Sequence, residues 1–520
     1  MHLPFRVLLL LVFAVPAFAQ PATYTNPVIP GDHPDPSVIR VGDEYWATAT
    51  TSQWAPIFPL LRSTDLVNWT HEGSVFERAP DWTAGRYWAP EIAEHEGQIF
   101  IYYTARKKDG LLCVAVATAD RPIGPYTDHG PMVCQEVGSI DGVPVTGEDG
   151  HRYLVWKEDG NSRQLPTPLW AQRLTRDGTT LVGERHELLR NEATWEGHLI
   201  EGAFLLRRNG WFYMFYSAGA CCGRGCDYRL GVARSRSLLE GWERHPANPI
   251  LAANESWQCP GHGSIVTDAR GRDFLLYHAY HPGDFEYAGR QALLDEIAWN
   301  DASGWPSING GRGPSRTAAA PHGVADREPA AVFVDELDSP SLAPGWQWPW
   351  DREPDRRLED GVLVLRTTGQ DAASAVSAVV ARPLLEERYV ATARVLTEGQ
   401  RGGTMTGLSV YGNAANAIGI SVATGRAIVW RRQKNQQRSL ATANVPAADA
   451  VLLRITAAGG SRFSFAVSTD GEQWRTVGDE AEGGELPPGD LAVRIALAVG
   501  GPAGAEGRFD WLRVERPRSQ

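Results

Sequence analysis

The hydrophobic residues before residue 320 follow a short-range alternation that is typical of β strands. Five segments repeat one pattern, a short apolar strand, a glycine-containing turn and an aromatic-rich strand: residues 36–50, 90–104, 141–156, 201–217 and 263–279. Each segment predicts an antiparallel hairpin. A further strand candidate follows every hairpin, and long helical periodicity is nearly absent here. A repeat at intervals of about 50 to 60 residues therefore predicts a five-bladed β-propeller.

The pattern changes after the last repeat. Residues 310–329 are rich in Gly, Pro and Ala without periodicity, which indicates a linker or a closing segment. Many short strand-like runs with polar or glycine turns follow, and they predict a β-sandwich. Trp346, Trp348 and Trp350 fit either a sugar platform or, as we favour, a core. We expect an all-β chain, with a signal peptide at 1–19, the propeller at 20–313, a linker at 314–329 and the sandwich at 330–520.

The N-terminus has the features of an export signal. Arg6 precedes an apolar run, and the segment closes on Ala17-Phe18-Ala19. This predicts cleavage after Ala19 and a secreted or periplasmic protein. The residue directly after the cleavage site is Gln20 and not cysteine, which argues against a lipoprotein anchor. No later stretch reaches the roughly 20 apolar residues of a membrane span, so no membrane insertion is expected.

Charge and cysteine content narrow the possible partners and sites. The formal net charge of −12 counts against nucleic acid or an anionic membrane as a partner. Cysteines of an exported chain indicate disulfides. We favour a Cys113–Cys134 pair and leave the pairing of the others open: Cys221, Cys222, Cys226 and Cys259. A metal site at Cys259 and His262 is the alternative, but the paired spacing of zinc ligands is absent.

One ionisable residue marks the start of the first strand in each of the five repeats. These residues are Asp35, Glu91, Asp141, Glu201 and His262. The first strand of a propeller blade is the innermost, so the five side chains are expected to meet around the axis. Clustered carboxyl groups raise one another's pKa values, and such clusters are typical of functional sites.

The motifs around these residues resemble glycoside hydrolase family 43. They read HPDPSV, WAPEI, SIDG, EGAFLLRRNGWFY and GHGSIV, and the resemblance spans about residues 24 to 310. It implies an inverting glycosidase in which Asp35 is the general base, Glu201 the general acid and Asp141 the residue that tunes the acid's pKa. Such an acid needs a pKa lifted to about 6–7, and like-charge repulsion from Asp141 can supply the rise. Two flanking prolines would hold Asp35 at a fixed distance from the sugar.

The resemblance assigns further residues around the sugar. It implies that His262 lies on the axis, either beside a water-mediated calcium ion or hydrogen-bonded without a metal; no cofactor is required. Arg290 is expected to reach the pocket, and Glu91 to shape it. Trp54, Phe58 and Trp88 are candidates for its walls. The looser match of the second region is to a concanavalin-like domain that supports the propeller, binds polysaccharide or sends a loop toward the site.

The expected function is removal of terminal pentofuranosyl residues from plant cell-wall polysaccharide, foremost as an α-L-arabinofuranosidase. A β-D-xylosidase, an endo-arabinanase and a galactofuranosidase are alternatives within the family. A non-catalytic carbohydrate-binding propeller is the alternative from another class, and it predicts that one of the three acids is missing. All three matched acids are present.

Overall fold

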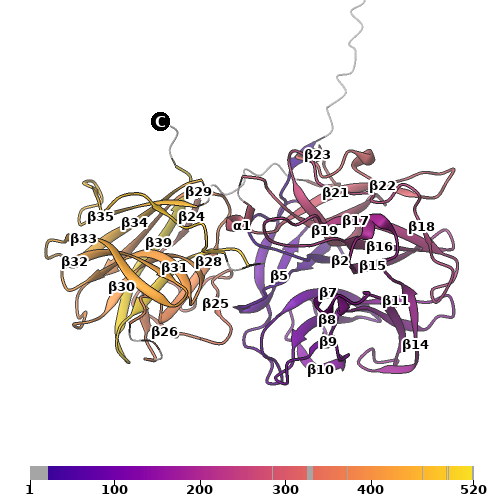
Figure 1. Cartoon of the computed structure of the whole chain (residues 1–520), viewed down its shortest axis with the longest axis horizontal. Helices are drawn as coiled ribbons and strands as arrows, with labels where there is room; N and C mark the ends of the chain where they lie inside the picture. Colours follow the sequence, from indigo (N-terminus) through magenta and orange to yellow (C-terminus); the bar gives the residue numbers. More distant parts are fainter. Residues whose placement is uncertain are drawn as a thin grey trace, which may run out of the picture.

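The computed structural model describes residues 22–517, apart from 284, 325–331, 370, 372, 460, 488 and 490. The signal peptide and part of the expected linker therefore lie outside the described residues. Strands dominate the chain, which forms two β domains side by side (Figure 1). The described residues contain no helix of the length and apolarity needed to cross a bilayer.

The N-terminal domain consists of five four-stranded antiparallel sheets. Their strands, from the first to the last of each sheet, are β2 (Ser37–Val41), β3 (Glu44–Thr48), β5 (Ile57–Ser63) and β6 (Thr70–Phe76); β7 (Trp88–His95), β8 (Gln98–Arg106), β9 (Leu112–Ala119) and β10 (Thr127–Val133); β11 (Ser139–Thr146), β12 (Arg152–Glu158), β13 (Leu169–Leu174) and β14 (Leu181–Leu189); β15 (Ile200–Arg208), β16 (Trp211–Ala218), β17 (Arg229–Ser235) and β18 (Glu243–Arg244); and β19 (Gln258–Thr267), β20 (Asp273–Tyr280), β21 (Gln291–Trp299) and β22 (Pro306–Ile308).

The first strands of these sheets form a closed ring. β2 contacts β7, β7 contacts β11, β11 contacts β15, β15 contacts β19, and β19 returns to β2. Apolar side chains of neighbouring sheets pack between them, as in the buried cluster that includes Val155 of β12 and Met214 of β16. Burial of such apolar surface between sheets holds the ring together. It also brings the starts of all five first strands to the axis.

The segment after the fifth sheet differs in part from the expected linker. Residues Thr317–Ala319 form β23, which pairs with β1 (Thr23–Thr25) near the start of the described chain. Asn26 adds hydrogen bonds from its side-chain amide to the Leu294 and Ser315 carbonyls. These contacts fasten both ends of the first domain to each other, so this part of the segment closes the ring instead of spacing two domains.

The C-terminal domain is a sandwich of two antiparallel sheets around one apolar core. One sheet contains β24 (Val332–Asp335), β26 (Asp355–Glu359), β27 (Val362–Arg366), β29 (Arg388–Leu396), β34 (Ala450–Ala458), β35 (Arg462–Ser468), β36 (Arg475–Thr476), β37 (Ala481–Glu482) and β39 (Glu506–Glu515). The other contains β28 (Ala378–Pro383), β30 (Met405–Asn413), β31 (Asn416–Ala423), β32 (Arg426–Gln433), β33 (Gln436–Asn444) and β38 (Arg494–Gly500).

The two domains are joined by paired strands and buried polar contacts. β4 (Trp54–Ala55) of the first domain pairs with β25 (Trp348–Pro349) of the second. Arg494 Nη2 lies 2.9 Å from Asp32 Oδ2, and both side chains are buried. Breaking one partner of a buried ion pair is strongly destabilising. The short helix α1 (Phe285–Ala288) adds Tyr287, whose hydroxyl donates to the Gly483 carbonyl.

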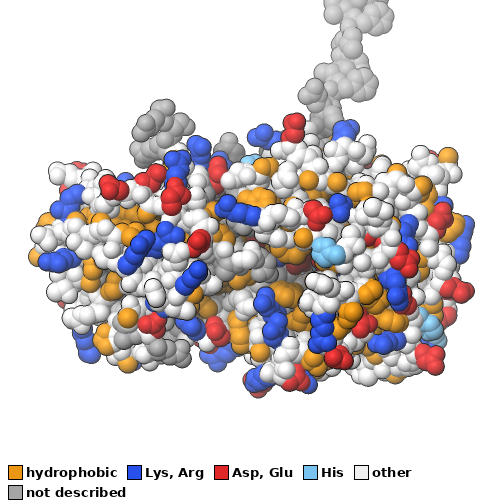
Figure 2. Space-filling model, viewed as in Figure 1, with side chains coloured by type: hydrophobic (Ala, Val, Ile, Leu, Met, Phe, Trp, Pro, Cys, Tyr) orange, Lys and Arg blue, Asp and Glu red, His pale blue; other side chains and the backbone are white. Residues whose placement is uncertain are grey.

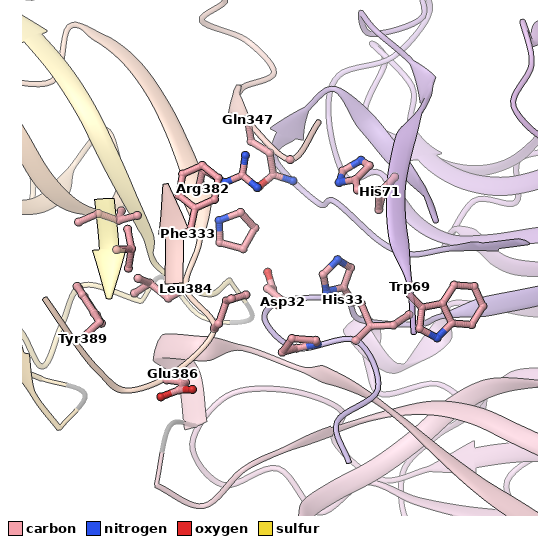
Figure 3. A pocket seen from close by; sticks show the side chains of 18 of the residues that line it. Asp32, His33, Trp69, His71, Phe333, Gln347, Arg382, Leu384, Glu386 and Tyr389 are labelled. Atoms are coloured by element: carbon pink, nitrogen blue, oxygen red, sulfur yellow. The ribbon is translucent and has the colours of Figure 1, made fainter. Parts of the chain in front are cut away.

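A pocket of about 240 Å³ lies between the domains (Figure 3). Asp32, His33, Trp69, Arg382 and Leu384 are among its lining residues. Its lining comes from both domains, so its surroundings are those of a domain interface. On the outer surface, acidic and basic side chains are interspersed over the face shown in Figure 2.

Candidate active site

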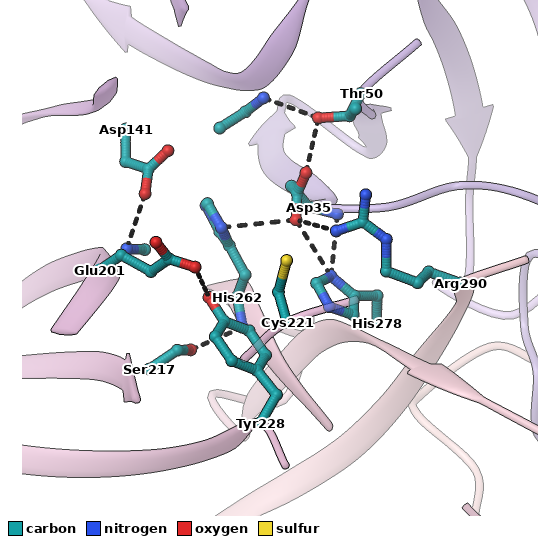
Figure 4. A network of polar contacts seen from close by, with 12 residues as sticks. Asp35, Thr50, Asp141, Glu201, Ser217, Cys221, Tyr228, His262, His278 and Arg290 are labelled. Carbon is teal, nitrogen blue, oxygen red and sulfur yellow. Dashed lines mark hydrogen bonds and ion pairs between the residues drawn. The ribbon is translucent and has the colours of Figure 1, made fainter. Parts of the chain in front are cut away.

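The five ionisable residues expected at the axis all lie at the inner strands. Asp35 stands two residues before β2, whereas Glu91, Asp141, Glu201 and His262 lie within β7, β11, β15 and β19. Figure 4 shows Asp35, Asp141, Glu201 and His262 in one cluster of polar contacts. The ring of first strands thus gathers side chains that are far apart in the sequence.

The inner strands are irregular at these residues. Backbone φ is positive at Asp35 (51°), Asp141 (59°) and His262 (41°), in a region where non-glycine residues are uncommon. The pairing of β11, β15 and β19 with their second strands shifts register beside Asp141, Glu201 and His262. Bulges of this kind redirect side chains and are frequent beside active sites. Here they accompany side chains that meet in one polar cluster.

The Asp35 carboxylate is held by several donors. Thr50 Oγ1 donates to Oδ2 at 2.7 Å, and Arg290 Nη1 donates to Oδ1 at 3.1 Å. His262 Nδ1 lies 3.5 Å from Oδ1. Burial acts to raise the pKa of Asp35, but the positive charge of Arg290, with a contribution from His262, outweighs it and holds the pKa well below its usual range. Asp35 is therefore an ionised carboxylate with fixed geometry.

His278 supports the Asp35 backbone as a neutral ring. The Asp35 N–H donates to His278 Nδ1 at 3.0 Å. Burial lowers the pKa of His278 to about 4, so the ring is uncharged at neutral pH. Because Nδ1 accepts this hydrogen bond, the ring proton is assigned to Nε2. The approach of Nδ1 to Asp35 Oδ1, at 3.2 Å, is consequently not an ion pair under these conditions.

Glu201 and Asp141 form a second pair of acids. Lys157 Nζ lies 2.6 Å from Glu201 Oε2, and the Tyr228 hydroxyl donates to Oε1 at 3.0 Å. Asp141 Oδ2 accepts the Gly202 N–H at 3.0 Å. Burial raises the pKa of Asp141 to about 6, and the neighbouring Glu201 charge adds to the rise against the opposing effect of His262. The protein thus separates the titration of these two acids.

The direction of the Glu201 shift differs from the sequence-based expectation. Burial acts to raise the pKa of Glu201, but the Lys157 ammonium outweighs it and lowers the pKa. The expectation considered only repulsion from Asp141 and missed the buried lysine. Lys157 is shared with Asp159, whose Oδ1 lies 2.8 Å from Nζ. This second carboxylate offsets part of the positive potential that Lys157 exerts on Glu201.

The prediction that Trp54 and Phe58 form walls of the sugar-binding pocket is wrong. Trp54 is 2% exposed, packs edge-on against Tyr411 and lies under the Arg494 guanidinium. Phe58 is fully buried among aromatic rings that include Tyr103. Both rings are used in packing, Trp54 at the domain interface and Phe58 in the core, so neither offers a face to a sugar.

Other expected residues lie near the axis. Trp88, at the start of β7, is half-buried and carries Arg86 over its ring at 5.2 Å. It remains a candidate wall. Glu91 lies on the same strand, and burial raises its pKa to about 8, so it is protonated at neutral pH. Arg290 reaches the cluster through Asp35, as described above.

The surroundings of His262 do not fit an ion held directly by the protein. Calcium takes six to eight oxygen ligands. In the part of the chain that the structure describes, no three His, Cys, Asp or Glu side chains converge as a ligand set. The His262 ring faces the Asp35 carboxylate, and its backbone N–H donates to Ser217 Oγ at 2.8 Å. These contacts favour the alternative of a hydrogen-bonded histidine without a metal. A calcium ion bound through water stays a hypothesis.

All six cysteines form disulfides within the described residues. The expected Cys113–Cys134 pair is confirmed. The other pairs are Cys226–Cys259 and the adjacent Cys221–Cys222. The alternative of a metal held by Cys259 and His262 is wrong, because the Cys259 sulfur is bonded to Cys226.

Comparison with known proteins agrees with the sequence motifs. Residues 24–306 match the family model described as glycosyl hydrolases family 43. The chain belongs to this family. Residues 334–488 match the beta xylosidase C-terminal concanavalin A-like domain, which covers most of the sandwich. The two matches divide the chain where the structure changes from the ring of sheets to the sandwich.

Individual members of family 43 resemble this chain at moderate identity. Xylosidase/arabinosidase 43B of Humicola insolens is 29% identical over 368 residues, which cover 65% of each chain. The non-reducing end alpha-L-arabinofuranosidase BoGH43B of Bacteroides ovatus is 28% identical over 67% of this chain and 65% of that protein. The matched regions thus span slightly less than two thirds of these relatives. The crystal structure of the Bacillus licheniformis family 43 protein BlXynB aligns with a TM-score of 0.83 and 26% identity, covering 95% of this chain and 100% of that one.

Several residues of this family 43 cluster were not anticipated from the sequence. Thr50, Lys157, Tyr228 and His278 all contact one of the acids. Lys157 offered a signal, because it continues the apolar run RYLVW into what becomes β12. A charged residue in such a run is rarely buried without a partner. The other three carried no distinguishing pattern.

Proposed function

We propose that this chain is an inverting glycoside hydrolase that releases terminal pentosyl residues from plant cell-wall polysaccharide. The observation that carries the proposal is the pair of contrasting acid environments on one axis. Asp35 is held ionised by Arg290, whereas Asp141 and Glu201 share a buried site with a raised pKa on Asp141. Pairs of acids whose pKa values are pushed apart are typical of general acid–base catalysis. In this proposal the five sheets are the five blades of a propeller.

Each acid has a defined part in the proposed reaction. The Asp35 carboxylate accepts a proton from a water molecule, and the oxygen of that water attacks the anomeric carbon. Glu201, in its protonated form, gives its proton to the glycosidic oxygen as the bond from that oxygen to the anomeric carbon breaks. Attack from the opposite face inverts the anomeric centre. Asp35 then loses its proton to solvent and Glu201 takes one up, which restores both acids.

Asp141, Lys157 and Tyr228 orient and tune the proposed acid. Tyr228 fixes one Glu201 oxygen and Lys157 the other. Asp141 carries negative charge above about pH 6, which opposes ionisation of Glu201, while Lys157 favours it. The protonated fraction of Glu201 is therefore set by a balance between these two neighbours.

Terminal rather than internal cleavage is supported by the second domain. Gly489 of the sandwich lies against Gly223 in the loop between β16 and β17, so that a Cβ added to Gly223 would come 3.3 Å from the Gly489 carbonyl oxygen. The sandwich thus borders a loop whose residue Tyr228 contacts Glu201. A border on that side favours a pocket over an open cleft.

Among pentosides, we propose an α-L-arabinofuranoside as the foremost substrate. A β-D-xyloside is the second candidate, supported by the match of residues 334–488 to a beta xylosidase C-terminal domain and by relatives named as xylosidases. Three disulfides support the further proposal that the chain is exported to an oxidising compartment.

The test is hydrolysis of aryl α-L-arabinofuranoside, β-D-xyloside and β-D-galactofuranoside beside a Glu201→Gln control. Activity on a pentoside, with the product of inverted configuration in an NMR time course, supports the proposal. Equal activity in the control on a pentoside whose leaving oxygen needs the proton would show that Glu201 is not the acid. If no aryl glycoside is cleaved, digestion of linear arabinan separates an endo-acting enzyme from a sugar-binding propeller.

A further inference from the structure

The loop between β16 and β17 contains a disulfide between adjacent residues. Cys221 and Cys222 are bonded to each other, and neither is buried. The Cys221 side chain packs against a buried cluster of Tyr228, Cys259 and Tyr280. Figure 4 shows the Cys221 sulfur among the polar side chains of the catalytic cluster. This disulfide has no part in the reaction described above.

Tyr228 links the disulfide to both halves of the site. Its hydroxyl donates to Glu201, the proposed acid, at 3.0 Å. Its ring stacks on His278 with centroids 5.7 Å apart and an interplanar angle of 2°. His278 in turn accepts the Asp35 N–H. Tyr228, against which Cys221 packs, is therefore connected to Glu201 directly and to the Asp35 backbone through His278.

Bracing the chain is a weak explanation for this bond. A disulfide stabilises mainly by closing a loop, and the effect grows with loop length. Adjacent cysteines enclose the shortest possible loop. The segment is also anchored without it, by the Cys226–Cys259 disulfide and by Asp227, which exchanges hydrogen bonds with Ala220. The Gly223 N–H adds a bond to the Tyr280 hydroxyl at 3.2 Å.

The chemical effect of the bond is on the surface. Two free thiols would offer weak donors and could ionise, which would place negative charge near Tyr228 and the acid that it contacts. The disulfide removes both possibilities and leaves a polarisable, apolar surface with fixed geometry. The other side chains of this cluster are mostly polar or charged, so the disulfide provides an apolar surface among them. A pentose ring needs such a surface for its C–H face.

We propose that the Cys221–Cys222 disulfide is an apolar wall of the sugar-binding site, against which the C–H face of the bound pentosyl ring packs. This inference rests on the proposed function, because it assigns the ligand as the sugar of that reaction. The wall contacts the ring in the bound and the reacting state alike. Its loss is thus expected to raise KM more than it lowers kcat.

The test compares paired variants on the aryl pentoside that the native protein cleaves. Cys221→Ser/Cys222→Ser is expected to raise KM about three- to tenfold, the effect of losing roughly 30 to 50 Å² of apolar contact, with kcat within about twofold. Cys221→Ala/Cys222→Ala keeps an apolar surface and is expected to raise KM less. Cys113→Ser/Cys134→Ser, which removes the disulfide of the second sheet, is the matched control and is expected to leave KM unchanged.

The outcomes are distinct. An unchanged KM in the folded serine pair would overturn the inference, and so would equal increases in the serine and alanine pairs, because loop mobility alone would then explain them. If the native protein cleaves no glycoside, the proposed function fails separately. Calorimetric titration of native protein and serine pair with L-arabinose and D-xylose then decides: weaker binding by the serine pair supports the wall, and equal or absent binding rejects it.

Discussion

Lys157 Nζ lies 2.6 Å from Glu201 Oε2, and the two side chains are 1% and 12% exposed. A buried ammonium group in contact with a carboxylate favours its ionised form. Glu201 is nevertheless the residue proposed to deliver a proton. The lysine therefore sets the pH above which the acid is no longer protonated.

Lys157→Met is expected to shift the alkaline limb of the kcat/KM profile to higher pH. Activity falls as pH rises through the pKa of the acid, and Lys157 lowers the pKa of Glu201. Without the ammonium, the acid stays protonated at higher pH. The measurement is a pH–rate profile of native and variant protein. Lys107→Met, at a partly exposed site, is the control. An unmoved alkaline limb in Lys157→Met would contradict the assignment of Glu201.

Asp141→Asn is expected to stabilise the fold at neutral pH. Burial raises the pKa of Asp141 to about 6, whereas an unfolded Asp has a pKa of about 3.9. Burial of the Asp141 carboxyl group therefore costs no folding free energy below about pH 4, where the group is protonated in both states. The cost appears as the pH rises from about 4 to 6, because the folded protein must then hold a buried charge. The variant should gain about 3 kcal/mol in the free energy of unfolding at pH 8. Denaturant unfolding at pH 8 and pH 4 measures this, and an equal difference at both values would refute the shift.

Glu201→Gln should impair reactions according to the leaving group. Proton transfer by a positioned acid contributes about 10²–10⁴-fold. A loss of that size is expected on an oligosaccharide, whose leaving oxygen needs the proton, and a much smaller loss on a dinitrophenyl glycoside. Steady-state rates on both substrates check this, with exposed Glu96→Gln as the control. Equal losses on the two substrates would remove Glu201 from the role of acid.

Arg494→Met is expected to destabilise the chain by about 3 kcal/mol, because it leaves Asp32 as a buried, unpaired carboxylate. Asp32→Asn/Arg494→Met removes both charges and should recover part of the loss. Thermal and denaturant unfolding of the three proteins measure the coupling. Additive effects in the double variant would show that the pair does not act as one.

Chelation is expected to leave activity within about twofold of the untreated protein. The described residues around His262 offer no set of three converging ligands for an ion, and calcium needs several oxygens. Assay after dialysis against a chelator, and again with added calcium, checks this. A loss that calcium restores would establish the water-mediated ion.

The inner positions could be predicted because they repeat. Asp35, Glu91, Asp141, Glu201 and His262 stand at equivalent points of a recurring strand pattern, and the ring follows from that pattern. Local alternation specifies which strand a residue belongs to. It does not predict which side chains of another sheet or domain will contact that residue.

The wrong predictions concern residues that contact side chains of another sheet or domain. Trp54 looked like a pocket residue, but Tyr411 and Arg494 of the second domain cover it. The lowered pKa of Glu201 arises from Lys157 on a neighbouring sheet. Trp346, Trp348 and Trp350 are no error, because they pack in the sandwich and at its interface, in agreement with the core role that we favoured. The pairing of adjacent cysteines could not be deduced from spacing, because several connectivities were possible.

Asp32, which binds Arg494 of the sandwich, stands three residues before Asp35 in the same turn. The turn that carries the proposed base is therefore anchored by Arg494 of the second domain. A gene fragment ending after the fifth sheet would encode all three acids yet leave the turn that carries one of them without its anchor. For protein engineering, this chain is a single unit and not a catalytic module with a detachable appendage.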